Sequence, residues 1–115
     1  MLFTGSDWCP PCQSLETNVL ASPHFVQFAE QNLVLLKLDY PRYKKQSSKL
    51  TRQNERLAKQ YKQKGYPTIV VLNSQGEEMD RLTGAYASAE ELVYWLTWVM
   101  PSERRLKDYE QWKEK

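Results

Sequence analysis

The sequence predicts a single α/β domain with a central mixed β-sheet flanked by helices. The chain has 115 residues, about the length of one domain, and its 41% hydrophobic content supports one packed core. Short apolar runs alternate with amphipathic segments, and turn residues separate them. The longest aliphatic runs, at 33–36 and 69–72, have four residues each, so we expect no membrane span.

The first half of the chain predicts two strands with two helices between them. Pro10 and Pro11 fit the first turn of a helix, and Ser22 followed by Pro23 starts a second one. A Leu- and Val-rich run before Pro41 is typical of a strand buried on both faces. The expected elements are a strand at 1–4, a loop at 5–8, helices at 10–20 and 23–31, and a strand at 33–40.

The second half begins with an amphipathic helix and continues with a hairpin. Leu50, Asn54, Leu57 and Tyr61 recur at helical spacing, which predicts a helix over 48–63 with these four residues facing the core. A β-branched strand at 68–72, a turn at 73–76 and an alternating strand at 77–83 predict an antiparallel hairpin.

A last helix closes the predicted domain. Ser88 and Glu91 form a capping box ahead of an apolar helical pattern that Pro101 ends. We therefore expect a domain over 1–101 and a charged tail over 102–115. We expect Trp95, Trp98 and Trp112 to be core or docking residues and His24 to be exposed.

Positive charge is concentrated between Arg42 and Lys64. This basic segment holds nine Lys or Arg against the single Glu55, although the whole chain carries only +2. It has few aromatic residues for stacking and no groove-binding motif, so we expect a solvated helix face and no nucleic acid.

The chemistry of the chain concentrates in Trp8-Cys9-Pro10-Pro11-Cys12. A helix start places Cys9 beside unpaired N–H groups and the positive end of the helix dipole, which favours its thiolate and makes it the nucleophile. Cys12, one turn further along, is the resolving thiol. The two prolines remove potential donors, so we expect a moderate fall in the pKa of Cys9 and a reducing pair. A structural or metal-binding role stays open on this motif alone.

A second motif, Gly65-Tyr66-Pro67-Thr68, stands directly before the strand of the hairpin. Proline is tolerated there at the first residue of a strand or in a special turn. With both motifs in place, residues 1–100 resemble the thioredoxin superfamily. The stretch Thr4–Cys9, Glu16 and Asp39-Tyr40-Pro41 resemble, more narrowly, bacterial extracytoplasmic Dsb-type reductases such as the DsbH group and the C-terminal domain of DsbD.

The resemblance implies a thioredoxin fold without its N-terminal strand and helix, because only eight residues precede Cys9. We therefore expect Met1 to be an internal start or a fragment boundary. The resemblance also implies that Pro67 is cis and faces the dithiol, and that the backbone of Tyr66 pairs with the substrate. We expect Trp8 to shield the dithiol and shape the substrate surface, with a plain packing role as the alternative.

The sequence departs from this family at Phe3, where most thioredoxins carry a buried Asp that accepts a proton. Glu16 shares one helical face with Cys9 and Cys12, and it is the candidate acceptor of the Cys12 proton. A solvated helix carboxylate is the alternative. We expect Lys37 to be a surface residue that faces Glu16 or solvent.

The resemblance implies a protein-disulfide reductase that uses neither cofactor nor metal. Its site residues are Cys9, Cys12 and Glu16 for catalysis, with Trp8, Tyr66 and Pro67 for substrate binding. Disulfide-bonded proteins are the expected substrates, an upstream thiol reductase is the electron donor, and the protein is a monomer. The location is extracytoplasmic, or cytoplasmic if Met1 is the true start. An oxidase or isomerase, a metal-handling protein and a non-catalytic module that uses the basic segment are the alternatives.

Overall fold

The computed structural model describes residues 1–84 and 88–99. The helix end at Pro101, Trp112 and the tail at 102–115 lie outside these residues. Strands and helices follow one another in the predicted order, and the elements are β1 (Leu2–Thr4), α1 (Pro10–Ser14), the π-helix η1 (Leu15–Leu20), α2 (Pro23–Asn32), β2 (Lys37–Asp39), α3 (Ser48–Gln60), β3 (Thr68–Leu72), β4 (Glu78–Thr83) and α4 (Ala89–Val99).

The strands form one mixed sheet in the order β2-β1-β3-β4. β1 runs parallel to β2, with Leu2 opposite Lys37, and antiparallel to β3. β3 and β4 form the predicted antiparallel hairpin, with an irregularity between Val71 and Leu72. The predicted mixed sheet is therefore confirmed, and β1, which leads into the cysteines, lies inside it.

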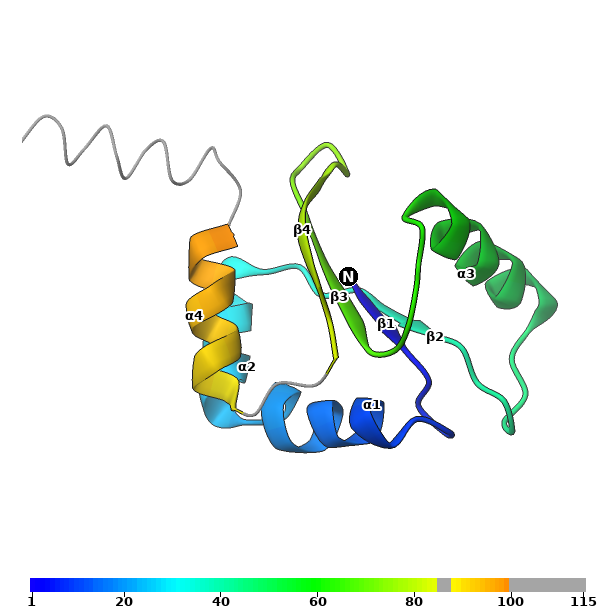
Figure 1. The fold of residues 1–115 in the computed structure, drawn as a ribbon, viewed down its shortest axis with the longest axis horizontal. Helices are drawn as coiled ribbons and strands as arrows, with labels where there is room; N and C mark the ends of the chain where they lie inside the picture. Colours follow the sequence, from blue (N-terminus) through cyan, green and yellow to red (C-terminus); the bar gives the residue numbers. More distant parts are fainter. Residues whose placement is uncertain (85–87, 100–115) are drawn as a thin grey trace, which may run out of the picture.

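Helices cover both faces of the sheet, as predicted. Figure 1 shows α3 on one side of the strands and α1, α2 and α4 on the other. Neighbouring residues of β3 serve the two faces: Val70 packs with Phe3 and Leu38, against which α3 lies, and Val71 packs in the larger cluster with η1, α2 and α4. This alternation is the two-residue period of a strand.

The strand expected at 33–40 is much shorter than predicted, and its burial on both faces is wrong. The strand holds only Lys37–Asp39, and of the run before it Val34 is 98% exposed, Leu35 64% and Leu36 48%. The sheet order explains the difference, because β2 is an edge strand whose neighbour β1 is three residues long. Leu36 O still accepts a bond from Leu2 N of β1 at 2.8 Å, but the rest of the run 33–36 has no strand to pair with among the described residues. The run borders an apolar groove that also involves Leu20 and Phe25.

The basic helix α3 ends three residues earlier than predicted. Lys62 adopts a left-handed φ of 50°, while Gln63 N donates to Ala58 O and Lys62 N donates to Lys59 O. These two bonds form a Schellman motif, which stops the helix after Gln60. Asn54 is buried as expected at 2% exposure, but Leu50 is 42% exposed and does not reach the core.

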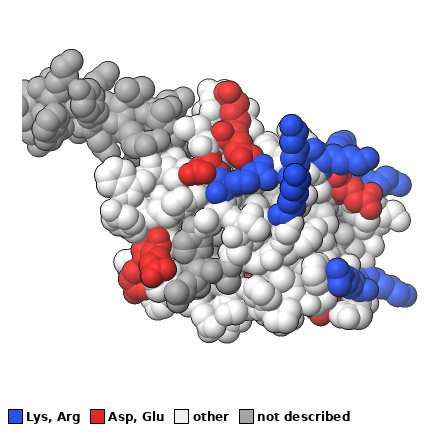
Figure 2. All heavy atoms as spheres, in the orientation of Figure 1, with Lys and Arg blue, Asp and Glu red and all other residues white. Residues whose placement is uncertain are grey.

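The charged side chains of the basic segment lie on the surface, and the aromatic side chains differ in their burial. All nine Lys and Arg of the basic segment are exposed, and Figure 2 shows blue side chains gathered on the side where α3 lies. His24 is exposed as expected, Trp95 packs against the larger core cluster, and Trp98 is 61% exposed, so it is not a core residue. In the described ranges, every helix is too short or too polar to cross a membrane.

Candidate active site

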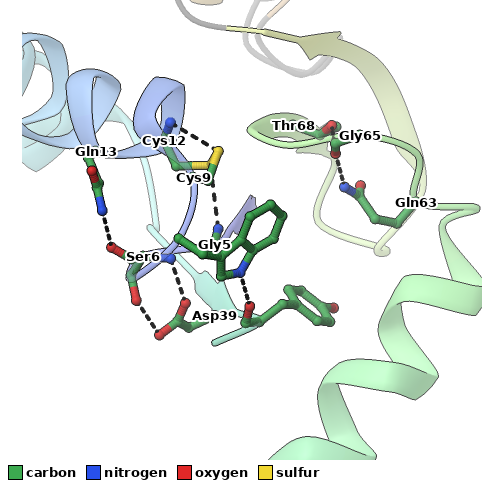
Figure 3. The surroundings of a disulfide bond; sticks show 11 residues. Gly5, Ser6, Cys9, Cys12, Gln13, Asp39, Gln63, Gly65 and Thr68 are labelled. Carbon is green, nitrogen blue, oxygen red and sulfur yellow. Dashed lines mark hydrogen bonds between the residues drawn. A yellow bond between two sulfur atoms is a disulfide. The ribbon is translucent and has the colours of Figure 1, made fainter. Parts of the chain in front are cut away.

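Cys9 and Cys12 are joined by a disulfide bond, with their Cα atoms 5.2 Å apart. Cys9 is the N-cap residue of α1, and its Sγ accepts a hydrogen bond from Cys12 N at 3.3 Å. Gly5 N donates to Cys12 Sγ at 3.4 Å (Figure 3). Cys9 is 5% exposed and Cys12 is fully buried, so of the two sulfur-bearing residues Cys9 is the more accessible.

The loop between β1 and α1 supports the disulfide through backbone hydrogen bonds. Cys9 N donates to Gly5 O at 3.0 Å, which turns the chain sharply out of the strand. Ser6 donates to Asp39 twice, from its backbone N at 3.1 Å and from its Oγ at 2.7 Å, and Figure 3 shows both bonds. The end of β2 therefore fixes the loop that carries the cysteines.

Asp39 is itself held in the charged form. Burial raises the pKa of this carboxyl. The hydrogen bonds from Lys44 and Ser6 lower it, and their combined effect is larger, so the pKa lies below its usual value. Lys44 Nζ lies 2.8 Å from Asp39 Oδ2. A charged group thus connects β2, the loop before α1 and the segment after β2.

Trp8 is half-buried and held on three sides. A Cβ placed on Gly5 would lie 2.6 Å from Trp8 Nε1, so glycine is needed there for the close approach of the indole. Trp8 Nε1 donates to Tyr40 O at 2.6 Å, and the indole packs edge-on against the ring of Tyr66, with centroids 5.3 Å apart. This ring contact brings the cysteine motif and the Tyr66-Pro67 motif together.

The peptide bond between Tyr66 and Pro67 is cis, and Pro67 is buried. Its carbonyl oxygen accepts a bond from Gly84 N at 2.8 Å, so β4 continues the hairpin up to this position. Burial raises the pKa of the Tyr66 hydroxyl. The cis bond that the resemblance implied is therefore confirmed.

Glu16 lies in η1 and pairs with Lys37 of β2, with Nζ and Oε1 2.6 Å apart. The Lys37 side chain is 53% exposed and that of Glu16 is 24% exposed. The expected surface lysine that faces Glu16 is thus present.

Two residues near the site were not singled out from the sequence. The Asp7 carboxylate accepts hydrogen bonds from the backbone N of Arg42, Tyr43 and Lys44, at 3.0, 3.0 and 2.8 Å. These backbone bonds hold the pKa of Asp7 below its usual value. The Arg42 guanidinium carbon lies 3.7 Å from the centroid of the Trp8 ring. No local pattern could have indicated this contact, because the two residues meet only when β2 lies beside β1.

The arrangement can take up two electrons, which would convert the disulfide into a thiol pair at the start of a helix. Within residues 1–84 and 88–99, no three His, Cys, Asp or Glu side chains gather as a set of metal ligands.

Comparisons with known proteins agree with this geometry. The family profile of the thioredoxin-like domain matches residues 1–99. The disulfide bond reductase DsbH of Chlamydia pneumoniae is 33% identical over 82 residues, which are 71% of this chain and 49% of that protein. The thiol:disulfide interchange protein DsbD of Pasteurella multocida is 33% identical over 98 residues, which are 84% of this chain and 16% of that protein. The chain therefore spans half the length of these relatives or less.

A solved structure of a DsbH oxidoreductase superposes on this one with a TM-score of 0.73 and 29% sequence identity. The match covers 84% of this chain and 67% of the other. The thioredoxin-like fold expected from the two motifs is thereby confirmed.

Proposed function

Because the chain belongs to the thioredoxin-like domain family, we propose that it is a thiol–disulfide oxidoreductase that reduces protein disulfides. The observation that carries this proposal is the Cys9–Cys12 disulfide at a helix start, with Cys12 N donating to Cys9 Sγ. Donation to that sulfur favours a thiolate on Cys9 once the bond is reduced, and the thiolate is the reactive form.

The reaction proceeds in two exchanges. The Cys9 thiolate attacks one sulfur of the substrate disulfide, forming a mixed disulfide and releasing one substrate sulfur as a thiolate that takes up a proton. Cys12 then loses its proton and attacks Cys9 Sγ, which releases the second substrate sulfur. The substrate gains two electrons and two protons, and the Cys9–Cys12 disulfide forms.

The second exchange needs a base for the Cys12 proton, and we assign that role to Glu16. It follows Cys12 by four residues in the sequence, and its partly shielded side chain pairs with Lys37. Phe3 occupies the place of the Asp that serves most thioredoxins.

The substrate binds across Trp8, Tyr66 and Pro67 in this proposal. The contact between the rings of Trp8 and Tyr66 makes one continuous surface beside the disulfide. The backbone of Tyr66 then pairs with an extended substrate segment.

The reducing direction rests on the prolines between the cysteines. Pro10 and Pro11 have no N–H to donate to a thiolate, which limits how far the reduced state is stabilised. We expect a reduction potential between about −270 and −200 mV, far from the strongly oxidising DsbA. An upstream thiol reductase of the DsbD kind then reduces the Cys9–Cys12 disulfide again. In this proposal, both reactions take place outside the cytoplasm.

Reduction of insulin by the protein with dithiothreitol as electron source tests the proposal. The wild type should accelerate precipitation of the insulin B chain over dithiothreitol alone, while Cys9→Ser should not. Equal rates for the wild type, Cys9→Ser and dithiothreitol alone would contradict catalysis. A potential near about −120 mV, with faster oxidation of reduced substrates than reduction, would instead identify an oxidase.

A further inference from the structure

Arg42 borders the surface that receives the substrate in the function proposed above. Its guanidinium carbon lies 3.7 Å from the centroid of the Trp8 ring, and Trp8 directly precedes Cys9. Trp8 in turn contacts the ring of Tyr66, next to the cis-proline. Burial raises the pKa of Tyr66, and the charge of Arg42 partly opposes this effect, so the cation also lies close to Tyr66.

The position of Arg42 is fixed from two sides. The Asp7 carboxylate holds the backbone N–H groups of Arg42 and its two successors. The indole beneath it is held by the bond from Trp8 Nε1 to Tyr40 O. Ordering Arg42 in this way before binding lowers the entropy that a substrate contact would cost.

Stacking uses only the face of the guanidinium. Its five N–H donors lie in the plane of the group, at its edge, and the indole leaves them available. Among the described residues, no carboxylate forms an ion pair with the Arg42 guanidinium. Asp7 accepts three backbone bonds, and Asp39 pairs with Lys44. Arg42 is exposed, and among the described residues its guanidinium contacts the Trp8 ring but no acidic side chain.

We propose that Arg42 binds a carboxylate of the polypeptide substrate, so that the protein prefers disulfides with Asp or Glu close to the attacked cysteine. This inference rests on the proposed reductase function and adds a substrate class to it. The planar edge of the guanidinium matches the two oxygens of a carboxylate, and a lysine at this place would offer only a point charge.

Three disulfide peptides that differ only beside one cysteine, with Glu, Gln or Lys there, test this preference. The measured quantity is the rate constant for the reaction of the reduced protein with each peptide, in single turnover. We expect the Glu peptide to react roughly two- to fivefold faster than the Gln peptide at low salt, because an exposed ion pair contributes little. The advantage should shrink as salt screens it.

Arg42→Gln should bring the Glu-to-Gln rate ratio to about one, and Arg42→Lys should leave an intermediate ratio. Arg52→Gln is the matched control, because it removes the same charge from an exposed position on α3 and should keep the wild-type ratio.

The possible results distinguish the role of Arg42 from the proposed reductase function. An unchanged ratio in Arg42→Gln, or a fastest reaction with the Lys peptide, would overturn the role of Arg42 and leave the reductase intact. Failure of the reduced wild type to react with any of the three peptides would overturn the reductase function, and the substrate preference with it.

Discussion

Lys37 Nζ lies 2.6 Å from Glu16 Oε1, and this ion pair connects the edge strand β2 to the helical segment that follows the two cysteines. The lysine is half-exposed, and the carboxylate is partly shielded from solvent. In the function proposed above, this carboxylate, four residues after Cys12, accepts the proton of the resolving thiol.

Glu16→Gln should slow disulfide reduction at neutral pH by about tenfold or more, because the amide cannot accept the Cys12 proton. The reduction potential should change much less, since the amide keeps the size of the side chain. Lys37→Gln is the control: it leaves the carboxylate in place, and the rate should fall by less than about fivefold. Equal rates for Glu16→Gln and wild type between about pH 6 and 8 would mean that Glu16 is a solvated carboxylate with no part in the reaction.

Gly5→Ala should destabilise the protein by about 1–3 kcal/mol, because the added methyl group would overlap the indole of Trp8. Urea unfolding measures this loss. The same substitution in a Trp8→Ala background should cost much less, since the overlapping ring is gone. The same cost in both backgrounds would mean that the indole is not what requires glycine.

Asp39→Asn should lower the free energy of unfolding at neutral pH by about 1 kcal/mol, because it removes the ion pair with Lys44 and weakens the bonds from Ser6. The pKa of Asp39 in the folded protein lies below its ordinary value of 3.8. Its contribution is therefore fully present above pH 3.8 and is lost as the pH falls through the lower folded value. Urea unfolding of both proteins from neutral pH down to about pH 2.5 should show the difference closing only at the acid end. A constant difference over this range would contradict the role of the Asp39 charge.

Cys12→Ser should accumulate a mixed disulfide between Cys9 and a substrate, because the resolving thiol is missing. Non-reducing gels of the protein mixed with a disulfide-bonded substrate should show a heavier band that dithiothreitol removes. Cys9→Ser should give far less of this band, because Cys12 is fully buried. Equal trapping by both variants would contradict the assignment of Cys9 as the nucleophile.

The helix starts and the hairpin were predictable because their signals are local. The N-cap bonds from Phe25 N to Ser22 Oγ and from Glu91 N to Ser88 Oγ join residues three apart, and the order of residues alone indicates them. The cysteine pair and the Tyr66-Pro67 motif are likewise short stretches of sequence. They were enough to indicate the family and the chemistry.

The end of α3 shows where a local pattern is not enough. The apolar spacing continues to Tyr61, but the left-handed Lys62 closes the helix with two backbone bonds. Lysine is not a residue that marks such a stop, so periodicity overestimated the length of the helix.

By itself the sequence determined the α/β order of elements, the redox pair and the proline motif, because each depends on residues close together in the chain. Only the tertiary structure decided that the run 33–36 lies outside β2, that Lys37 meets Glu16 and that Arg42 lies on Trp8. These features depend on which strand lies beside which, and on the charges and rings that the sheet order brings into contact. The spacing of residues along the chain does not indicate these contacts.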